Sequence, residues 1–449
     1  MTDSTTVERP FGRHLTGPLD YGALVTDDFR VHRSIFTDPK IFEDEMVRIF
    51  GGTWVYLLHE SEIPEPFDFE TRRVGRRPVI VTRAEDGEIH VLLNRCTHRG
   101  TLLCPLESGN QKRFQCAYHG WTFSNSGELT AITYPDGYRE DFCKEAYNLG
   151  KAPRVQSYRG FVFCSFNPDV ESVESWMGPA RAIFDWAVDR AGGDGNIKMV
   201  KASTMEYRGN WKLQNDNNGD MYHVPFTHRS TLTMTHQRHG AGKSLDHFKG
   251  DQSPMTVRDL GNGHKMIDQR PSIGSVWERA RPIPGRETQA EQLISRIGEQ
   301  RARQYLEYIG RSGLNLVLYP NLVVDGGDGT LVWRVYQPVA TNLTTVHSYV
   351  AALANVPREV NTLRMRFAED FSNVGNRDDF EVFERIQQAL ETVDPLEWVD
   401  VSRGFRTDRE ERQPDGSLAG NVTDETGIRA GYVRWRELMS APSSSPLLV

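Results

Sequence analysis

The residues with the clearest chemical potential in this chain are two cysteines and two histidines in two short groups. Cys96 and His98 form one group, Cys116 and His119 form the other, and seventeen residues, 99–115, separate them. Thiolate and imidazole groups bind zinc or iron–sulfur centres. A zinc finger keeps its cysteines in one half and its histidines in the other, whereas each half is mixed here. We therefore expect a cluster of two irons and two sulfides, with two Cys on one iron and two His on the other. A structural zinc site is the alternative.

A second group of ligand-type residues, Asp220, His223 and His228, lies in the next part of the chain. Asp220 and His223 are three apart, so we expect them to share a helix face and to form a hydrogen bond. The two histidines are five apart, which separates them by about 140° on a regular α-helix. A break in the helix would realign them, and Pro225 favours one. Two histidines with a carboxylate favour a mononuclear non-haem Fe(II) site, although a lone histidine is more often a core or surface residue.

Both groups lie in segments that resemble a known family. The boxes Cys96-Thr97-His98-Arg99-Gly100 and Cys116-Ala117-Tyr118-His119-Gly120-Trp121 resemble those of Rieske proteins. Residues 210–228 resemble the iron-binding motif of the catalytic α subunit of Rieske non-haem iron ring-hydroxylating oxygenases. The chain keeps Asn210-Trp211-Lys212, Asn217, Asp220, Tyr222-His223 and His228, and has Asp216 where the family usually has Glu. The resemblance covers nearly the whole chain.

The resemblance implies roles for further residues. The third iron ligand of the family is a distant Asp, and the matching segment here is 376–387, where we expect Asp378 with Asp379 as the alternative. The bridging acid of the family corresponds to Asp220, which would link His119 or His98 of a neighbouring subunit to His223. This arrangement implies a head-to-tail homotrimer, with or without a small β subunit.

The resemblance also implies an activity. The [2Fe-2S] Rieske cluster would receive electrons from a separate reductase, with or without a ferredoxin, and pass them through Asp220 to the mononuclear Fe(II). With O2 as co-substrate, the enzyme would cis-dihydroxylate an aromatic ring, and the overall layout and length favour an aromatic acid. The alternatives are a Rieske-type monooxygenase or O-demethylase and, from another class, a non-catalytic electron carrier.

Composition limits the other possibilities. The chain has 449 residues, a net charge of −8 and five cysteines. The acidic balance gives no basic surface for nucleic acid, and no apolar run is long enough to cross a membrane. Five cysteines in a chain of this length do not make a disulfide framework, so we expect reduced thiols and a cytoplasmic location.

The elements that must hold these groups follow from local patterns. We expect an α+β protein in which a small all-β Rieske domain, 51–167, is inserted into a larger unit. Residues 1–50 would pack with the catalytic mononuclear iron domain, 168–449. The resemblance implies that this domain has a central antiparallel sheet flanked by helices (helix-grip, START-like). The patterns predict helices over 38–50, 173–191 and 378–392, and a hairpin of 79–82 with 89–93. They also predict strands over 314–324, 331–336 and 344–352, and irregular segments over 235–300.

Overall fold

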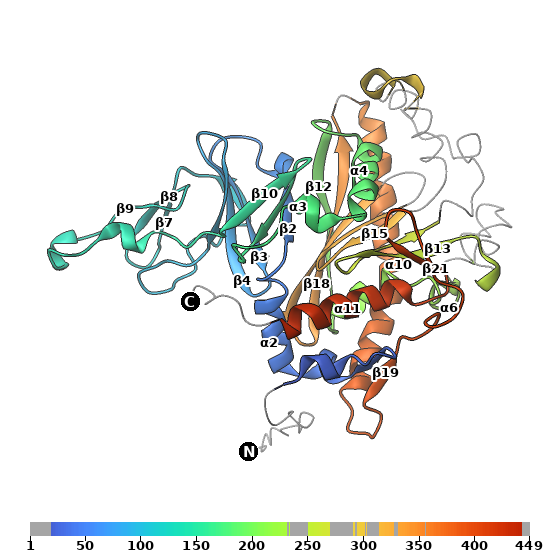
Figure 1. Ribbon diagram of the computed structural model, residues 1–449. Coiled ribbons are helices and arrows are strands. Elements are labelled where there is room, and N and C mark those ends of the chain that lie inside the picture. Colours follow the sequence, from blue (N-terminus) through green and yellow to red (C-terminus); the bar gives the residue numbers. More distant parts are fainter. Residues whose placement is uncertain are drawn as a thin grey trace, which may run out of the picture.

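The computed structural model describes residues 19–230, 233, 250–269, 291, 294–300, 302, 314–326, 331–354 and 356–441. Within them, a small part built of strands lies beside a large antiparallel sheet that helices cover (Figure 1). The predicted α+β class, with a small all-β unit and a large sheet flanked by helices, is confirmed.

The small part consists of three antiparallel sheets, with strand orders β5-β4-β3-β6, β10-β11-β2 and β7-β8-β9. Its strands are β2 (Val55–His59), β3 (Asp68–Val74), β4 (Arg77–Arg83), β5 (Ile89–Leu93), β6 (Ser108–Asn110), β7 (Arg113–Gln115), β8 (Thr122–Ser124), β9 (Leu129–Ala131), β10 (Arg154–Tyr158) and β11 (Phe161–Ser165). Three 3₁₀ helices connect them, η2 (Glu60–Glu62), η3 (Pro135–Gly137) and η4 (Lys144–Tyr147). The predicted hairpin around Asp86-Gly87 is confirmed by the antiparallel pairing of β4 with β5. In its turn, Gly87 takes a positive φ of +89°, which glycine adopts without strain.

The large sheet has nine strands among the described residues, in the order β12-β18-β17-β16-β15-β14-β13-β21-β20, all antiparallel to their neighbours. Their bounds are β12 (Ile197–Tyr207), β13 (Thr256–Gly261), β14 (His264–Asp268), β15 (Leu314–Leu318), β16 (Leu322–Gly326), β17 (Leu331–Ala340), β18 (Leu343–Leu353), β20 (Glu411–Arg412) and β21 (Leu418–Asn421). The middle strands are buried almost throughout, because helices or the small part cover the sheet.

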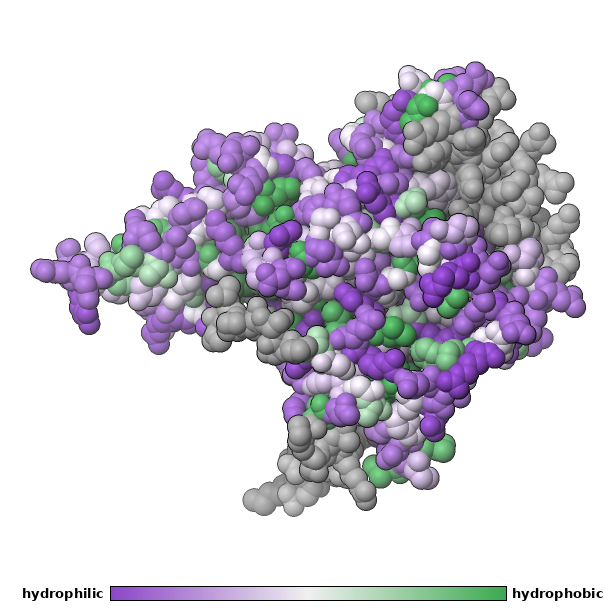
Figure 2. Space-filling model, viewed as in Figure 1, coloured by the Kyte–Doolittle hydropathy of each residue, from purple (hydrophilic) through white to green (hydrophobic). Residues whose placement is uncertain are grey.

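Helices cover this sheet, and the longest of them carries part of the second candidate site. α10 (Arg358–Leu390) packs along β12 and β18, and α11 (Thr426–Ser440) packs on β13 and β14. The other helices are α3 (Val173–Met177), α4 (Ala180–Ala191), α5 (Trp211–Asn217), α6 (Val224–Thr227) and the 3₁₀ helix η5 (Gly250–Gln252). None of the helices within the described residues combines the length and apolar character that crossing a membrane requires. The face drawn in Figure 2 is largely hydrophilic, with hydrophobic residues in small groups.

The N-terminal segment packs against the large sheet's helices. It contains η1 (Tyr21–Leu24), β1 (Arg30–His32), α1 (Ser34–Thr37) and α2 (Pro39–Arg48), and β1 pairs with β19 (Trp398–Asp400) from the far end of the chain. The predicted helix over 38–50 is confirmed as α2: Asp38 caps it by accepting a hydrogen bond from the Lys40 N–H, and Pro39 occupies its first turn. Residues 1–18 lie outside the described residues.

Several sequence predictions differ from the structure. The helix predicted over 173–191 is two helices, because Gly178, with φ of +49°, and Pro179 interrupt it. The strand predicted over 314–324 is the hairpin pair β15 and β16. The prediction of irregular structure over 235–300 is wrong for 250–269, where β13 and β14 pair; most of the remainder lies outside the described residues.

Candidate metal centres

The two Cys/His groups lie in two loops with the same backbone hydrogen bonds. In the loop after β5, the Cys96 N–H donates to the Thr101 carbonyl (2.8 Å) and the Gly100 N–H donates to the Cys96 carbonyl (2.9 Å). In the loop between β7 and β8, the Cys116 N–H donates to Trp121 (2.8 Å) and the Gly120 N–H donates to Cys116 (3.0 Å). Each loop has a glycine at the equivalent position, where a positive φ is required: Gly100 with φ of +75° and Gly120 with φ of +73°. Each cysteine is therefore held by its own loop.

The four side chains meet as the sequence predicted. Cys96 and Cys116 are buried and their thiols are neighbours; burial raises the pKa of the Cys96 thiol, and the thiol of Cys116 raises it further. The rings of His98 and His119 are half-buried and lie 4.7 Å apart between centroids. Two adjacent buried thiols beside two imidazoles suit a [2Fe-2S] cluster with mixed ligands. The donors present therefore fit the group that the sequence implies.

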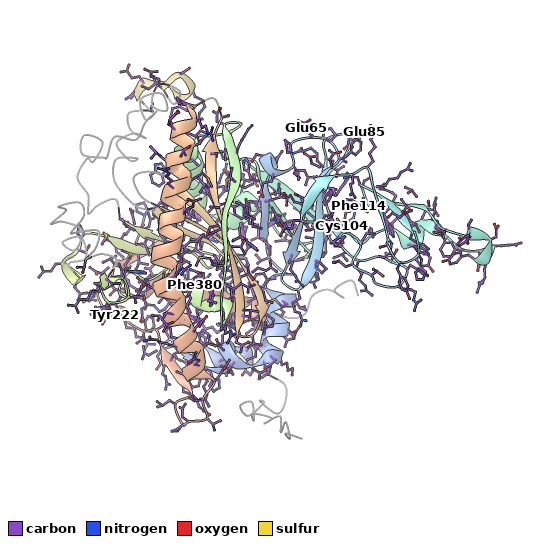
Figure 3. The ribbon with its side chains drawn as sticks, turned by 180° about the vertical axis from the view of Figure 1, so that it is seen from behind. Glu65, Glu85, Cys104, Phe114, Tyr222 and Phe380 are labelled. Carbon is purple, nitrogen blue, oxygen red and sulfur yellow. The ribbon has the colours of Figure 1, made fainter. Side chains whose placement is uncertain are left out.

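Two neighbours of this cluster site were not singled out from sequence. The indole of Trp121 stacks on the His98 ring, with centroids 4.7 Å apart and planes 10° apart. Cys104 lies nearby in the same core (Figure 3), where its backbone N–H donates to the Asn94 side chain (2.8 Å). Cys104 therefore has a packing role.

The Asn210-Trp211-Lys212 motif begins the second site and anchors it to the N-terminal segment. Asn210 caps α5 by accepting a hydrogen bond from the Lys212 N–H (3.1 Å). The Trp211 indole donates to Glu45 on α2 (2.9 Å), and the Lys212 ammonium lies 2.6 Å from the other oxygen of that carboxylate. A buried charge needs an oppositely charged partner. The contacts of Trp211 and Lys212 with Glu45 therefore hold the first turn of α5 against α2.

The two histidines of the second site flank a helix of one turn. α5 ends at Asn217, and a turn leads to His223, which precedes α6, while His228 follows it. Pro225 occupies the first turn of α6. The break predicted between the two histidines is not found: residues 224–227 form one continuous helical turn between them, and the interruption lies earlier, between Asn217 and His223. The expectation of a shared helix face for Asp220 and His223 is wrong: the contact exists, with the Asp220 Oδ2 atom 3.3 Å from the His223 Nδ1 atom, but it forms within the turn.

The acids on α10 complete this site, and the two neighbouring candidates take different places. The Asp379 Oδ1 atom lies 3.1 Å from the His228 Nε2 atom and 3.5 Å from the His223 Nε2 atom. The Asp378 Oδ2 atom instead lies 3.2 Å from the His228 Nδ1 atom. Donor atoms of His223, His228 and Asp379 all lie within 4.8 Å of one another. The geometry therefore favours Asp379, the alternative, over Asp378.

Each imidazole of this site thus has an Nε2 atom directed to Asp379 and an Nδ1 atom facing an outer carboxylate. Asp220 is the outer acid of His223, and Asp378 is the outer acid of His228. A metal-bound histidine usually has a carboxylate or carbonyl at its other nitrogen, which fixes its tautomer and orientation. The residues present fit a mononuclear metal ion held by two histidines and one carboxylate.

Charge around the site acts on His228. Burial lowers the pKa of this imidazole, but hydrogen bonds and the negative charges of Asp379 and Asp378 outweigh it, so the pKa lies above the usual value. The Asn217 amide also reaches the centre, with its Nδ2 atom 3.1 Å from the His223 Nε2 atom and 3.2 Å from the Asp379 Oδ1 atom. In the sequence, Asn217 stands out only as part of the motif, and its place beside His223 and Asp379 is visible only in the structure.

Asp216, where the resembling family usually has Glu, is a half-buried residue near the end of α5. The Tyr432 hydroxyl on α11 donates to it (2.6 Å). Burial raises the pKa of Asp216 to about 7, against the opposing charge of Lys265. Burial also lowers the pKa of the Lys265 ammonium to about 8, and the ammonium donates to Asn215 (2.6 Å). The shorter acid is therefore accommodated by a tyrosine that reaches it.

Comparison with known proteins shows the family of the chain. Residues 53–158 match the family described as "Rieske [2Fe-2S] domain", and residues 195–441 match "Ring hydroxylating alpha subunit (catalytic domain)". These two matches define a Rieske protein with a ring-hydroxylating catalytic domain. The chain belongs to the Rieske non-haem iron ring-hydroxylating oxygenases, as a catalytic α subunit.

The most similar relatives include large subunits of dioxygenases. The α subunit of toluate 1,2-dioxygenase from Pseudomonas putida is 37% identical over 83% of each chain, and the large subunit of anthranilate 1,2-dioxygenase from Acinetobacter baylyi is 35% identical over 84% of this chain and 80% of that one. Among solved structures, naphthalene 1,2-dioxygenase with bound indole matches with a TM-score of 0.79 and 25% identity over 94% of this chain and 95% of that one. The family carries a Rieske cluster and a mononuclear iron and uses O2.

Proposed function

We propose that this chain is the terminal oxygenase subunit of a system that cis-dihydroxylates the ring of an aromatic acid. One ring, one O2, two electrons and two protons give one cis-dihydrodiol, and a separate reductase, with or without a ferredoxin, supplies the electrons. Relatives named for toluate, 2-halobenzoate and anthranilate are 35–37% identical to the chain, whereas those named for naphthalene are 30–31% identical. This difference supports an aromatic acid as substrate.

The observation that carries the catalytic assignment is the convergence of His223, His228 and Asp379. We assign these three residues as ligands of the mononuclear iron, and Cys96, His98, Cys116 and His119 as ligands of the cluster. In place of the expected Asp378, the assignment takes Asp379, because only its carboxylate faces the Nε2 atoms of both histidines. When bound, the iron supplies the activation of O2.

The residues of the chain around this site position the ligands. Asp220 and Asp378 each face an Nδ1 atom and hold the imidazoles in the orientation that directs the Nε2 atoms to Asp379. The Asp220 carboxylate is also fixed, because its Oδ1 atom accepts hydrogen bonds from the backbone N–H groups of Tyr222 (2.5 Å) and His223 (3.3 Å). Oriented ligands leave coordination positions for dioxygen.

We further infer that electrons pass between subunits of a head-to-tail homotrimer. The cluster region, near Cys104 and Phe114, and the iron-site turn at Tyr222 lie on opposite sides of one chain (Figure 3). Large exposed apolar side chains stand beside both sites, Tyr118 at the cluster and Tyr222 and Phe226 at the iron site. Asp220 would accept a hydrogen bond from His98 or His119 of a second copy. The names of two relatives contain the words "large subunit". These names support a small β subunit as a further component of the assembly.

The remaining proposals concern boundaries and location. We propose domain boundaries at 1–50, 51–167 and 168–449, which the extents of the two family matches support. The five cysteines are free thiols, which supports a reducing compartment and hence the cytoplasm.

Product analysis under ¹⁸O₂ tests the proposed reaction. The purified oxygenase, with a reductase of the benzoate type and NADH, would be given a panel of aromatic acids and hydrocarbons. We expect a cis-dihydrodiol of an aromatic acid that carries two labelled atoms. A product with one labelled atom would assign the chain as a monooxygenase or O-demethylase, and electron transfer without any oxygenated product across the panel would favour an electron carrier.

A further inference from the structure

We propose that Arg334 is a positioning residue that fixes the distance between the two halves of the iron site, an inference that rests on the iron-binding function proposed above. The iron site is assembled from two separate elements. His223 and His228 flank α6, whereas Asp379 comes from α10. Because the ligands come from different elements, something must hold those elements at the correct separation.

The Arg334 guanidinium makes the link. Arg334 lies on β17 and is only 3% exposed. Its Nη2 atom donates to the Asn218 Oδ1 atom (2.9 Å) at the end of α5, and its Nη1 atom donates to the Asn376 Oδ1 atom (3.0 Å) on α10. One side chain therefore joins α10 to the end of α5, from which the turn to His223 and α6 starts.

Each of these partners lies next to a residue of the metal site. Asn218 directly follows Asn217, whose amide contacts the His223 Nε2 atom and the Asp379 Oδ1 atom. Asn376 precedes Asp379 by three residues, which places the two about 5 Å apart on the same side of α10. A shift of α10 relative to Arg334 would therefore move Asp379. A shift of the end of α5 would move Asn217 and the start of the turn that leads to His223.

The chemistry of the side chain suits this role. A guanidinium presents donors in a rigid planar fork, whereas a lysine ammonium is a single point that cannot keep several divergent hydrogen bonds. A carboxylate next to Arg334 balances its positive charge, because the Arg334 Nη2 atom lies 2.6 Å from the Asp325 Oδ2 atom on β16. Asn376 is also buried, so its side-chain oxygen would lose this donor without gaining water. The buried Asn218 oxygen would keep only the longer contact with the Asn315 amide (3.4 Å).

Two other roles for Arg334 make different predictions. A purely structural residue would change the stability of the fold and leave the Fe(II) affinity of the folded protein unchanged. An anchor for the carboxylate of a substrate would be accessible and would change KM for acids. Arg334 is buried, and its guanidinium faces Asn218, Asn376 and Asp325, which favours positioning over anchoring.

The test is the Fe(II) affinity of Arg334→Lys holoenzyme that keeps its cluster. Equilibrium dialysis of iron-depleted protein against Fe(II) under anaerobic conditions gives the affinity. Visible circular dichroism reports the cluster, and far-UV circular dichroism with thermal unfolding checks that the catalytic part is folded. We expect the Fe(II) affinity to fall roughly 10- to 100-fold, as when other outer partners of metal ligands are removed. Uncoupled release of hydrogen peroxide during turnover should rise in parallel.

Arg364→Lys is the matched control. Arg364 is also buried (5% exposed) and lies on α10, but its Nη1 atom donates to the backbone carbonyls of Ala191 (3.2 Å) and Ala351 (2.9 Å). It precedes Asp379 by fifteen residues, or about 22 Å along the helix. The control should lose stability and keep the wild-type Fe(II) affinity.

Each outcome decides the proposal. Wild-type Fe(II) affinity and coupling in Arg334→Lys would overturn it, as would an increase in KM for an aromatic acid with unchanged Fe(II) affinity. If Arg334→Lys does not retain its cluster, Asn376→Leu removes one arm of the link, and an unchanged Fe(II) affinity in that variant would equally overturn the proposal. A wild-type protein that binds no Fe(II) would instead reject the proposed iron site itself.

Discussion

The cluster site and the iron site of this chain are built in opposite ways. The cluster ligands come from two loops, each closed by its own backbone hydrogen bonds, within residues 96–121. The iron site brings together His228 and the α10 acids, and the contact between His228 and Asp378 spans 150 positions of the chain. The first site is local, whereas the second depends on how α5, α6 and α10 pack on the sheet. A local site should survive damage elsewhere, and an assembled site should not.

The two pairs of histidines also differ in their electrostatic surroundings. His98 and His119 lie among aromatic rings, those of Trp121 and Tyr118. Within the part of the chain that the structure describes, no carboxylate lies at ion-pair distance from either ring. His223 and His228 each contact two carboxylates. The cluster imidazoles therefore remain available for an external contact, while those of the iron site are held from both nitrogens.

Replacing one iron ligand should abolish iron binding at the mononuclear site and leave the cluster site unchanged. In His223→Ala, we expect turnover to be lost and the iron content to fall from about three atoms per chain to about two, because only the mononuclear ion loses a ligand. The visible and EPR spectra of the cluster should not change. Product formation at the wild-type rate would remove His223 from the iron site, and loss of the cluster signal would show that the two sites are not independent.

The neighbouring acids on α10 should give unequal effects. Asp379→Asn should remove the mononuclear iron, whereas Asp378→Asn should keep it with an affinity reduced by roughly 10-fold, in the range of outer-partner substitutions. Metal analysis after gel filtration at limiting Fe(II) distinguishes them, and each variant is the control for the other. The reverse order of effects would restore Asp378 as the ligand.

A third substitution tests the connection between the sites. Asp220→Asn keeps the shape of the side chain and removes the charge that faces the His223 Nδ1 atom. We expect iron and cluster contents to remain, and oxidation of the pre-reduced cluster by O2 in the presence of substrate to slow by roughly 10- to 100-fold. Stopped-flow absorbance of the cluster measures this rate. An unchanged rate would exclude Asp220 from the electron path.

The same contrast explains what could be predicted from the sequence. The cluster ligands were identified because all four residues and both loop glycines are close in sequence. Asp378 and Asp379 could not be distinguished, since successive residues on a helix differ by about 100° in direction and only packing decides which one faces the histidines. The helix predicted over 378–392 is the last part of α10, which begins at Arg358. The earlier part was missed although its apolar residues recur at helical spacing (Val360, Leu363, Phe367, Phe371 and Val374). Arg334 carried no sequence signal, because Asn218 and Asn376 lie 116 and 42 positions away and only Asp325, on the neighbouring strand, is close in sequence.

The catalytic part should also respond to acid, more modestly, through a buried histidine. His264 on β14 is completely buried, where its Nδ1 atom accepts a hydrogen bond from the Tyr319 N–H (3.0 Å) and its Nε2 atom contacts the Trp176 carbonyl (2.9 Å). Burial lowers the pKa of this imidazole from 6.5 to about 3. Below pH 6.5 the unfolded chain therefore binds a proton that the folded chain does not bind until near pH 3.

The free energy of unfolding of the catalytic part should consequently fall as the pH drops through this window, by about 1.4 kcal/mol per pH unit from this residue. Urea unfolding followed by tryptophan fluorescence at pH 7.5 and pH 5.5 measures the change, with visible circular dichroism following the cluster region separately. His264→Gln can keep both hydrogen bonds but does not titrate, so its stability should depend less on pH. An equal pH dependence in this variant and the wild type would assign the acid sensitivity to other groups, and an equal loss of the cluster signal over the same window would show that the two regions unfold together.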